Sequence, residues 1–198
     1  MARAGLTADR VAQAAADLAD EIGLDQVTVS EVARRFDVKT ASLYSHVAGS
    51  HDLRVRIALL ALDDMADRVA EAVAGRSGRE ALGAYADVYR DYARGHPGRY
   101  AAAQTRLDAE TAARSAGPRH AAMTRAILRG YALGGDDQTH AVRLLGSTIH
   151  GYVTLEMGGG FSHSAPDTHE TWVRVLDALD ALLRSWPTTV DESGQARA

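Results

Sequence analysis

The polar residues from Lys39 to His46 have the types and spacing in this sequence that best suit hydrogen bonding to a partner molecule. Lys39, Thr40, Ser42, Tyr44 and His46 bring an ammonium group, short hydroxyls, a phenol and an imidazole into one short stretch. Side chains of this kind suit a helix that enters the major groove of DNA, where they meet base edges and phosphates. The same pattern also fits the solvated face of an ordinary helix pair, and the spacing alone favours neither interpretation.

A short helix is predicted just before this polar set, beginning after Thr28. Thr28 and Glu31 have the spacing of a capping box, in which the Thr28 side chain accepts the Glu31 N–H and the carboxylate reaches back to the helix start. Val29, Val32 and Phe36 then recur at helical spacing and form one apolar stripe. The pattern therefore predicts a short helix that buries one face.

A sharp turn and a second helix are predicted next. Asp37 tolerates the left-handed backbone conformation better than most residues other than glycine, so the chain can reverse direction there. Val38 fills the corner, and a helix over Lys39–Val47 would turn Leu43 inward. Two short helices joined in this way over residues 28–47 have the pattern of a helix-turn-helix motif.

The run Leu43-Tyr44-Ser45-His46-Val47 resembles the N-terminal signature of TetR-type transcriptional regulators. The resemblance extends back through Leu6–Gly23, as a first helix, and forward into the helix that follows the motif. Three positions depart from the family pattern. Asp37 stands where the family has Gly, Val47 where Phe is commoner, and Ser50 where a phosphate-binding Lys is usual.

The resemblance implies a function and roles for individual residues. Tyr44 and His46 would hydrogen-bond DNA phosphates, and Thr28 would do the same at its helix start. The alternative is that Tyr44 packs on the first helix and His46 is merely exposed. The remaining DNA-binding candidates would face bases or lie beside them: Lys39, Thr40, Ser42 and, on the preceding helix, Ser30.

Composition limits the class of protein. The chain has 198 residues, no Cys and a net charge of −4, so a disulfide framework and any Cys-based metal site are excluded. We find no signal peptide and no apolar run long enough for a membrane span, and we therefore expect a cytoplasmic protein that does not enter a membrane. Acidic residues slightly outnumber basic ones in the first 60 positions. DNA contacts would then rely on hydroxyls, backbone N–H groups and helix N-termini as well as cations.

Helical periodicity continues through the rest of the chain, and no window alternates with period two, so we expect an all-α fold. An N-terminal three-helix DNA-binding domain is predicted at residues 1–48. A C-terminal helical domain that binds a ligand and dimerises is predicted at 49–187, and we expect residues 188–198 to be disordered. Helices of the second domain are predicted over residues 53–74, 79–94, 117–133, 136–157 and 168–186.

The second domain contains candidates for a ligand site. The segment Ile149–Val153, followed by Leu155-Glu156 and a Gly-rich exit to Phe161, resembles a ligand-sensing domain of TetR-type regulators. A polar stripe in the same helix could line a cavity together with aromatic and Met side chains of other helices. For each of these residues ordinary core packing is the alternative. The candidates are Arg143, Ser147, His150 and Thr154 in the stripe, and Met65, Tyr85, Tyr89, Met123 and Trp172 elsewhere.

The last two helices are predicted to form a dimer interface, because they are apolar on more than one face. A dimer would let two short helix-turn-helix motifs read a palindromic double-stranded operator. The apolar residues in question are Leu145, Ile149, Tyr152 and Val153 in one helix and Leu176, Leu179, Leu182 and Leu183 in the other.

Catalysis and metal binding find no support in the motifs. His163, Asp167 and His169, near Glu156, do not have the spacing of a zinc site, and no nucleophile triad or paired carboxylate motif occurs. We expect no cofactor, no metal and no enzyme activity. The sequence predicts a ligand-responsive regulator, a repressor released from its operator by a small molecule. The alternative is a small all-α enzyme or ligand carrier that does not bind DNA.

Overall fold

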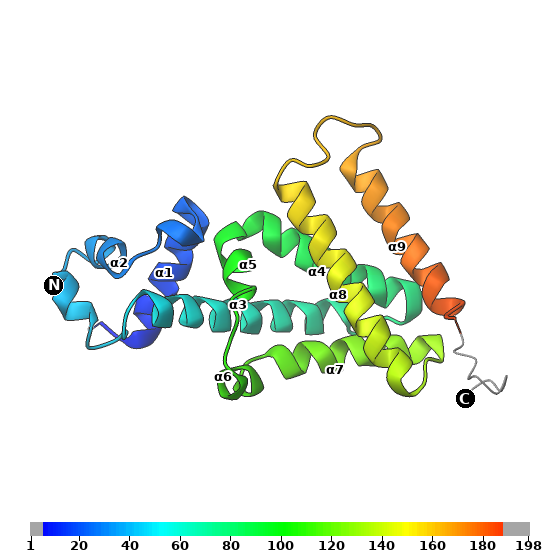
Figure 1. Ribbon diagram of the computed structural model, residues 1–198, viewed down its shortest axis with the longest axis horizontal. Helices are drawn as coiled ribbons and strands as arrows, with labels where there is room; N and C mark the ends of the chain where they lie inside the picture. Colours follow the sequence, from blue (N-terminus) through cyan, green and yellow to red (C-terminus); the bar gives the residue numbers. More distant parts are fainter. Residues whose placement is uncertain (1–5, 188–198) are drawn as a thin grey trace. The chain divides into compact units, whose positions relative to one another are not determined.

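The computed structural model describes residues 6–187, which confirm the all-α expectation (Figure 1). Over this range helices are joined by turns and loops, and no strand occurs. Contacts divide the chain into two compact units. The first unit comprises the residues up to Asp67 together with Asp91–Pro118, and the second comprises Arg68–Arg90 together with the residues from Arg119 onward. The tail predicted at residues 188–198 lies outside the described range.

The first unit holds the predicted helix-turn-helix domain and more. Residues 91–118 belong to this unit because α5 (Pro97–Ala103) packs on α1 (Ala8–Ile22). At this contact the Asp20 carboxylate accepts the Arg99 backbone N–H at 2.9 Å and lies 3.1 Å from His96 Nδ1. Fully buried Val11, Val32, Leu43 and Leu53 contribute to one apolar core. Its elements are α1 (Ala8–Ile22), η1 (Leu24–Gln26), α2 (Val29–Arg35), η2 (Thr40–Leu43), α3 (Ser50–Val73) as far as Asp67, α5 (Pro97–Ala103) and α6 (Ala109–Arg114).

The second unit is built around a buried layer between its long helices. In Figure 1, α8 and α9 run side by side in opposite directions. Leu145 of α8 and Trp172 and Leu183 of α9 are almost completely buried. Its elements are α4 (Gly78–Gly95) as far as Arg90, most of α7 (Gly117–Leu128), η3 (Arg129–Tyr131), α8 (Gly135–Met157) and α9 (Thr168–Arg184).

Two predicted helix boundaries were wrong. The helix expected to start at residue 53 starts at Ser50, because Asp52 accepts the Ala48 N–H at 2.9 Å and so organises the turn before it. The helix expected over 117–133 leaves α geometry after Leu128, where η3 tightens the chain before Ala132 adopts a left-handed conformation at φ 53°.

Candidate nucleic-acid interface and effector site

The start of the helix-turn-helix motif contains the Thr28 half of the predicted capping box. Thr28 Oγ1 accepts the Glu31 N–H at 3.2 Å and caps α2, while the Glu31 carboxylate pairs with Arg34. Asp37 has φ 54°, so the left-handed turn predicted there is confirmed. The Val38 N–H then donates to the Ala33 carbonyl at 3.1 Å and closes the end of the helix. These bonds direct the following segment out of α2 at a sharp angle.

The second helix of the motif is shorter than predicted. The expected helix over Lys39–Val47 is a 3-10 turn over Thr40–Leu43, followed by further turns. Ser45 Oγ donates to the Ser42 carbonyl at 3.0 Å, and a side-chain bond to nearby backbone competes with regular helix. Leu43 is fully buried, so the segment still presents its apolar side to the core as expected.

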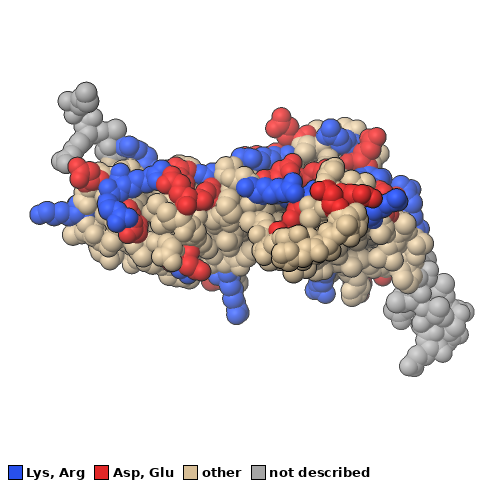
Figure 2. All heavy atoms as spheres, turned by 90° about the horizontal axis from the view of Figure 1, so that it is seen from above, with Lys and Arg blue, Asp and Glu red and all other residues tan. Residues whose placement is uncertain are grey.

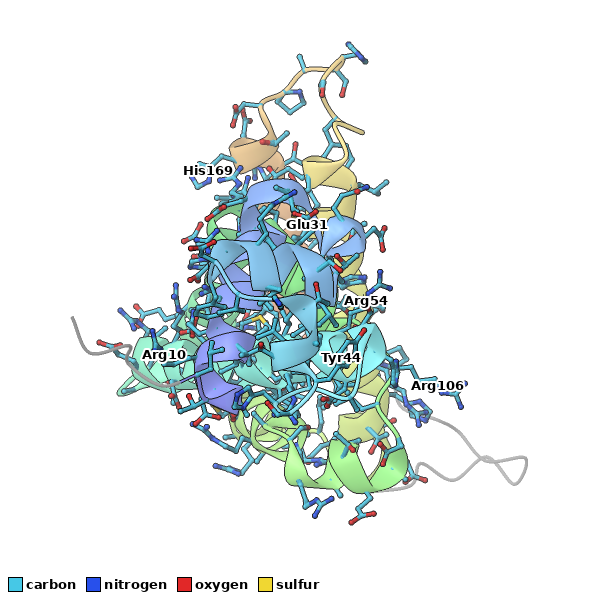
Figure 3. All side chains as sticks on the ribbon, turned by 90° about the vertical axis from the view of Figure 1, so that its left-hand side faces the viewer. Arg10, Glu31, Tyr44, Arg54, Arg106 and His169 are labelled. Carbon is cyan, nitrogen blue, oxygen red and sulfur yellow. The ribbon has the colours of Figure 1, made fainter. Side chains whose placement is uncertain are left out.

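Every DNA-binding candidate lies at the surface of the first unit. Tyr44, labelled in Figure 3, has 58% of its surface exposed. Lys39, Ser42, Thr28 and Ser30 are also exposed, whereas Thr40 and His46 are half-buried. Tyr44 therefore keeps more than half of its surface available to a partner. The structure places the predicted residues on η2, on the turns beside it and at the start of α2.

The surroundings of these residues are not strongly basic. Arg34 pairs with Glu31, and Arg35 donates to Glu21 at 2.7 Å, a hydrogen bond that lowers the pKa of the Glu21 carboxyl. Basic and acidic side chains lie interspersed on the face drawn in Figure 2. Lys39 is the sole Lys of the sequence. Hydroxyl, phenol and imidazole groups therefore make up most of the candidate interface.

A buried polar network in the second unit joins α4 and α7. Thr124 Oγ1 lies 3.0 Å from the Tyr85 hydroxyl, which lies 3.2 Å from the Tyr89 hydroxyl. The Tyr89 hydroxyl in turn lies 2.5 Å from His120 Nδ1. Tyr85, His120 and Thr124 are buried, and Met123 of α7 is half-buried. Two predicted candidates, Tyr85 and Tyr89, thus meet two polar residues that the sequence analysis missed.

The polar stripe of α8 is mostly exposed. Arg143, Ser147 and Thr154 are exposed and His150 is half-buried, whereas the core face of α8 carries Leu145 and its buried neighbours. The exposed residues Arg143, Ser147 and Thr154 therefore do not join buried Tyr85 around an enclosed cavity. The helical spacing predicts a polar stripe on α8, but it does not indicate which side of the helix is covered by other helices.

Trp172 serves as a packing anchor for α9. Its Nε1 donates to Asp87 at 2.7 Å, and its ring lies under the Arg90 guanidinium at 5.2 Å. Arg90 binds both oxygens of Glu156, at 2.8 and 2.6 Å, and its Nη1 lies 3.2 Å from His169 Nδ1. The hydrogen bonds to Glu156 raise the pKa of Arg90. This buried ion pair was not foreseen, because an Arg on a helix reads as a surface residue.

Other candidates have different surroundings. Met65 is buried in α3 as part of the first unit. Within the described range, no group of three or more His, Asp or Glu side chains is placed to hold a metal ion. Over the same range, no helix is both long and apolar enough to cross a membrane.

Known proteins resemble this chain both in sequence and in fold. The tetracyclin repressor-like, C-terminal domain family matches residues 82–179. The HTH-type transcriptional regulator Rv0681 of Mycobacterium tuberculosis, itself uncharacterised, is 35% identical over 161 residues, which cover 79% of this chain and 72% of that protein. The similarly uncharacterised regulator YobS of Bacillus subtilis is 29% identical over 187 residues, covering 93% and 92% of the two chains.

Solved structures agree on the fold. ActR from Streptomyces coelicolor, without ligand, superposes with a TM-score of 0.73 at 19% identity and covers 93% of this chain and 97% of its own. A TetR variant from Acinetobacter baumannii in complex with minocycline gives 0.70 at 20% identity, covering 93% and 100%.

Fold and motif together define a helix-turn-helix transcriptional regulator. The chain belongs to the TetR family, as the resemblance of its Leu43–Val47 run predicted. It is a ligand-responsive DNA-binding regulator and not an enzyme. Members of this family bind operator DNA and small-molecule effectors and form dimers.

Proposed function

We propose that this protein is a repressor whose dimer binds a palindromic operator and leaves it when a small molecule binds. Residues 1–48 would bind the operator, and residues 49–187 would bind the effector and dimerise. The observation that carries the DNA-binding half is the polar set from Lys39 to His46, which lies at the surface of a capped, sharply turned motif. Leu43 and Val47 of the same segment are buried, so the polar groups of the set remain accessible to a partner.

Within the motif we assign two kinds of DNA contact. Tyr44, His46 and Thr28 would bind phosphates, which position the protein without reading sequence. The residues assigned to base edges, where hydrogen bonds specify sequence, are Lys39, Thr40 and Ser42, with Ser30 beside them. A motif with one Lys displaces few counterions from DNA, so its affinity for DNA should decrease only slightly as the salt concentration rises.

For the effector we assign the network between α4 and α7 in the second unit. Tyr85, Tyr89, His120 and Thr124 supply hydrogen-bonding groups in buried surroundings, and Met123 adds an adaptable apolar wall. An effector that takes over one of these hydrogen bonds would rearrange the others, because the groups form one connected chain. Coupling to operator binding would then be reciprocal.

The dimer interface is assigned to the outward faces of α8 and α9. Most of the apolar residues first considered for it, Leu145 and Leu176 among them, are buried within the subunit and cannot contact a partner. Leu182 and Val173 of α9 remain exposed, and so do Leu155 and Met157 of α8, at 39–55% of their surface. Large apolar side chains left open on two adjacent helices are typical of a dimerisation face. Ser147 and Thr154, which are exposed on α8, are assigned to this face as well.

The proposal is tested by binding of the purified chain to DNA from upstream of its own gene. Footprinting should show one protected site with two-fold symmetry, and sedimentation should give two chains per site. Leu155→Arg should reduce both dimerisation and DNA binding, whereas Ala122→Arg, at an exposed position of α7, should leave them unchanged. Tight binding by a monomeric Leu155→Arg variant would contradict the dimer assignment. If no metabolite extract releases the protein from a symmetric site, the assignment as an effector-controlled repressor is contradicted.

A further inference from the structure

A cavity of about 330 Å³ lies within the first unit, against the N-terminal half of α3. Small-molecule pockets occupy about 300–1,000 Å³, so the volume suits a compact ligand. None of its lining residues belongs to the network assigned to the effector. They are Asp52, Val55, Arg56 and Leu59 of α3, with Thr111 and Arg114 of α6.

The lining combines an apolar floor with two cations. Val55 and Leu59 are half-buried hydrophobic residues one helical turn apart. Arg114 reaches the cavity from α6. It forms an ion pair with Glu110, and the side chains of the two residues are 73% and 77% exposed. An exposed pair of this kind contributes little, so the Arg114 guanidinium can turn to another anion at small cost.

Arg56 also has donors to offer. It contacts both oxygens of Asp52 through Nε, at 3.1 Å each. The two Nη groups of a guanidinium carry further N–H donors, in a planar fork that matches a carboxylate. The Asp52 carboxylate in the lining would repel a multiply charged anion. A single carboxylate on an apolar group fits this combination of charges best.

The cavity also touches the residue that organises the exit from the DNA-binding motif. Asp52 Oδ2 accepts the Ala48 N–H at 2.9 Å, and Ala48 directly follows Val47, the buried last residue of the motif. A ligand that draws Arg56 away from Asp52, or that moves the Asp52 carboxylate, therefore acts on the turn that leads from the polar set into α3.

We propose that this cavity is a second ligand site, which takes a small monocarboxylate with an apolar body. The carboxylate pairs with Arg114 and Arg56, and the apolar group lies on Val55 and Leu59. Occupation changes DNA affinity through the contact between Asp52 and Ala48. The site is additional to the effector network and lies in the unit that carries the DNA-binding motif.

The ligand half is tested by calorimetric titration of the full chain with phenylacetate and octanoate, each compared with its neutral primary amide. At least one carboxylate should bind saturably and its amide about tenfold more weakly or worse, since the charge-assisted pairing is lost. Arg114→Ala should weaken binding by a similar factor, and Val55→Phe, which fills the floor, should abolish it. Arg106→Ala, which changes an exposed Arg outside the cavity, is the matched control.

Three results would overturn the site. They are no saturable binding of either carboxylate, equal binding of acid and amide, and equal effects of Arg114→Ala and Arg106→Ala. Because Arg114 is exposed, its variant should remain folded, which circular dichroism checks. This titration needs no DNA and so stands apart from the proposed repressor function.

The regulatory half is tested by fluorescence anisotropy on the upstream DNA fragment. A saturating concentration of the bound carboxylate should shift the midpoint of DNA binding several-fold in the wild-type chain and in Arg106→Ala. The shift should be lost in Arg114→Ala at the same concentration. An unchanged midpoint in the wild-type chain would overturn the coupling through Asp52.

Discussion

Gly98 of α5 lies directly against the backbone of Ala19 in α1. A Cβ placed on Gly98 would overlap the Ala19 carbonyl and come within 2.6 Å of the Asp20 backbone nitrogen. These atoms belong to helix backbone and cannot move aside as a flexible side chain would. The absence of a side chain at residue 98 therefore permits the close packing of α5 on α1.

Gly98→Ala should destabilise the protein by about 1–3 kcal/mol or more, the range found for overpacked sites. Thermal unfolding measures this loss. Gly95→Ala is the matched control, because a Cβ there meets nothing within 4 Å and the backbone φ is not in the left-handed region. The control should be neutral or slightly stabilising, as Ala is the better helix former. Equal stabilities of the two variants would contradict the close approach.

The buried pair between Arg90 and Glu156 gives a second prediction. Their side chains are only 3% and 9% exposed, so removing one partner leaves an unpaired buried charge. Glu156→Leu should cost about 3–5 kcal/mol, whereas adding Arg90→Met should recover much of this loss. Denaturant unfolding of both single variants and the double variant forms the required cycle. Additive effects would show that the pair does not act as a unit.

A third prediction concerns pH and Asp180. Hydrogen bonds from Arg184 at 2.9 Å and from the Tyr131 hydroxyl at 2.7 Å lower the pKa of Asp180 below its ordinary value. Because the pKa of Asp180 is lowered, its charged form stabilises the fold at every pH above the ordinary pKa of Asp, which is about 4. This contribution is lost as the pH falls from there through the lowered pKa.

Asp180→Asn should therefore be less stable than the wild-type chain at pH 7, by about 1 kcal/mol. The difference should shrink as pH falls from about 4 toward the lowered pKa. Unfolding curves across this range give the measurement. A difference that grows in acid would have the opposite sign and would contradict the assignment. The hydroxyl of Tyr131 has a raised pKa, mainly through burial, so its neutral form persists into alkaline solution.

Ser50 provides a fourth prediction. It is exposed and is the first residue of α3, at the position where the family usually has a phosphate-binding Lys. Ser50→Lys should tighten DNA binding and steepen the salt dependence by about 0.9 for each added phosphate contact. A salt titration of DNA affinity measures the slope. An unchanged slope would place residue 50 away from the DNA backbone.

Local sequence rules predicted the motif well because its structure is determined by near neighbours. Thr28 caps α2 and Asp37 reverses the chain through contacts within a few residues. The length of the next helix was overestimated, since the competition of Ser45 for nearby backbone cannot be read from apolar spacing. Polar spacing in α8 was visible in the sequence, but the burial of one side depends on distant helices.

Contacts between distant segments were beyond prediction for the same reason. The pairing of Arg90 with Glu156 and the meeting of Tyr89 with His120 join residues far apart in the chain. Gly98 gave no local signal of its role either, because its constraint comes from Ala19. A single sequence indicates which residues are apolar or polar, but it does not indicate which of them will meet.

The central claim is that the exposed set from Lys39 to His46 reads operator DNA, and competition binding tests it most directly. Affinities of the wild-type chain, Lys39→Ala and Tyr44→Phe would be measured against the upstream operator and its single-base variants. Tyr44→Phe should weaken binding to every sequence by a similar factor, because a phosphate contact carries no sequence information. Lys39→Ala should instead lose about 1–3 kcal/mol of discrimination at one base position in each half-site. A uniform loss from Lys39→Ala, or unchanged affinity in both variants, would contradict the account.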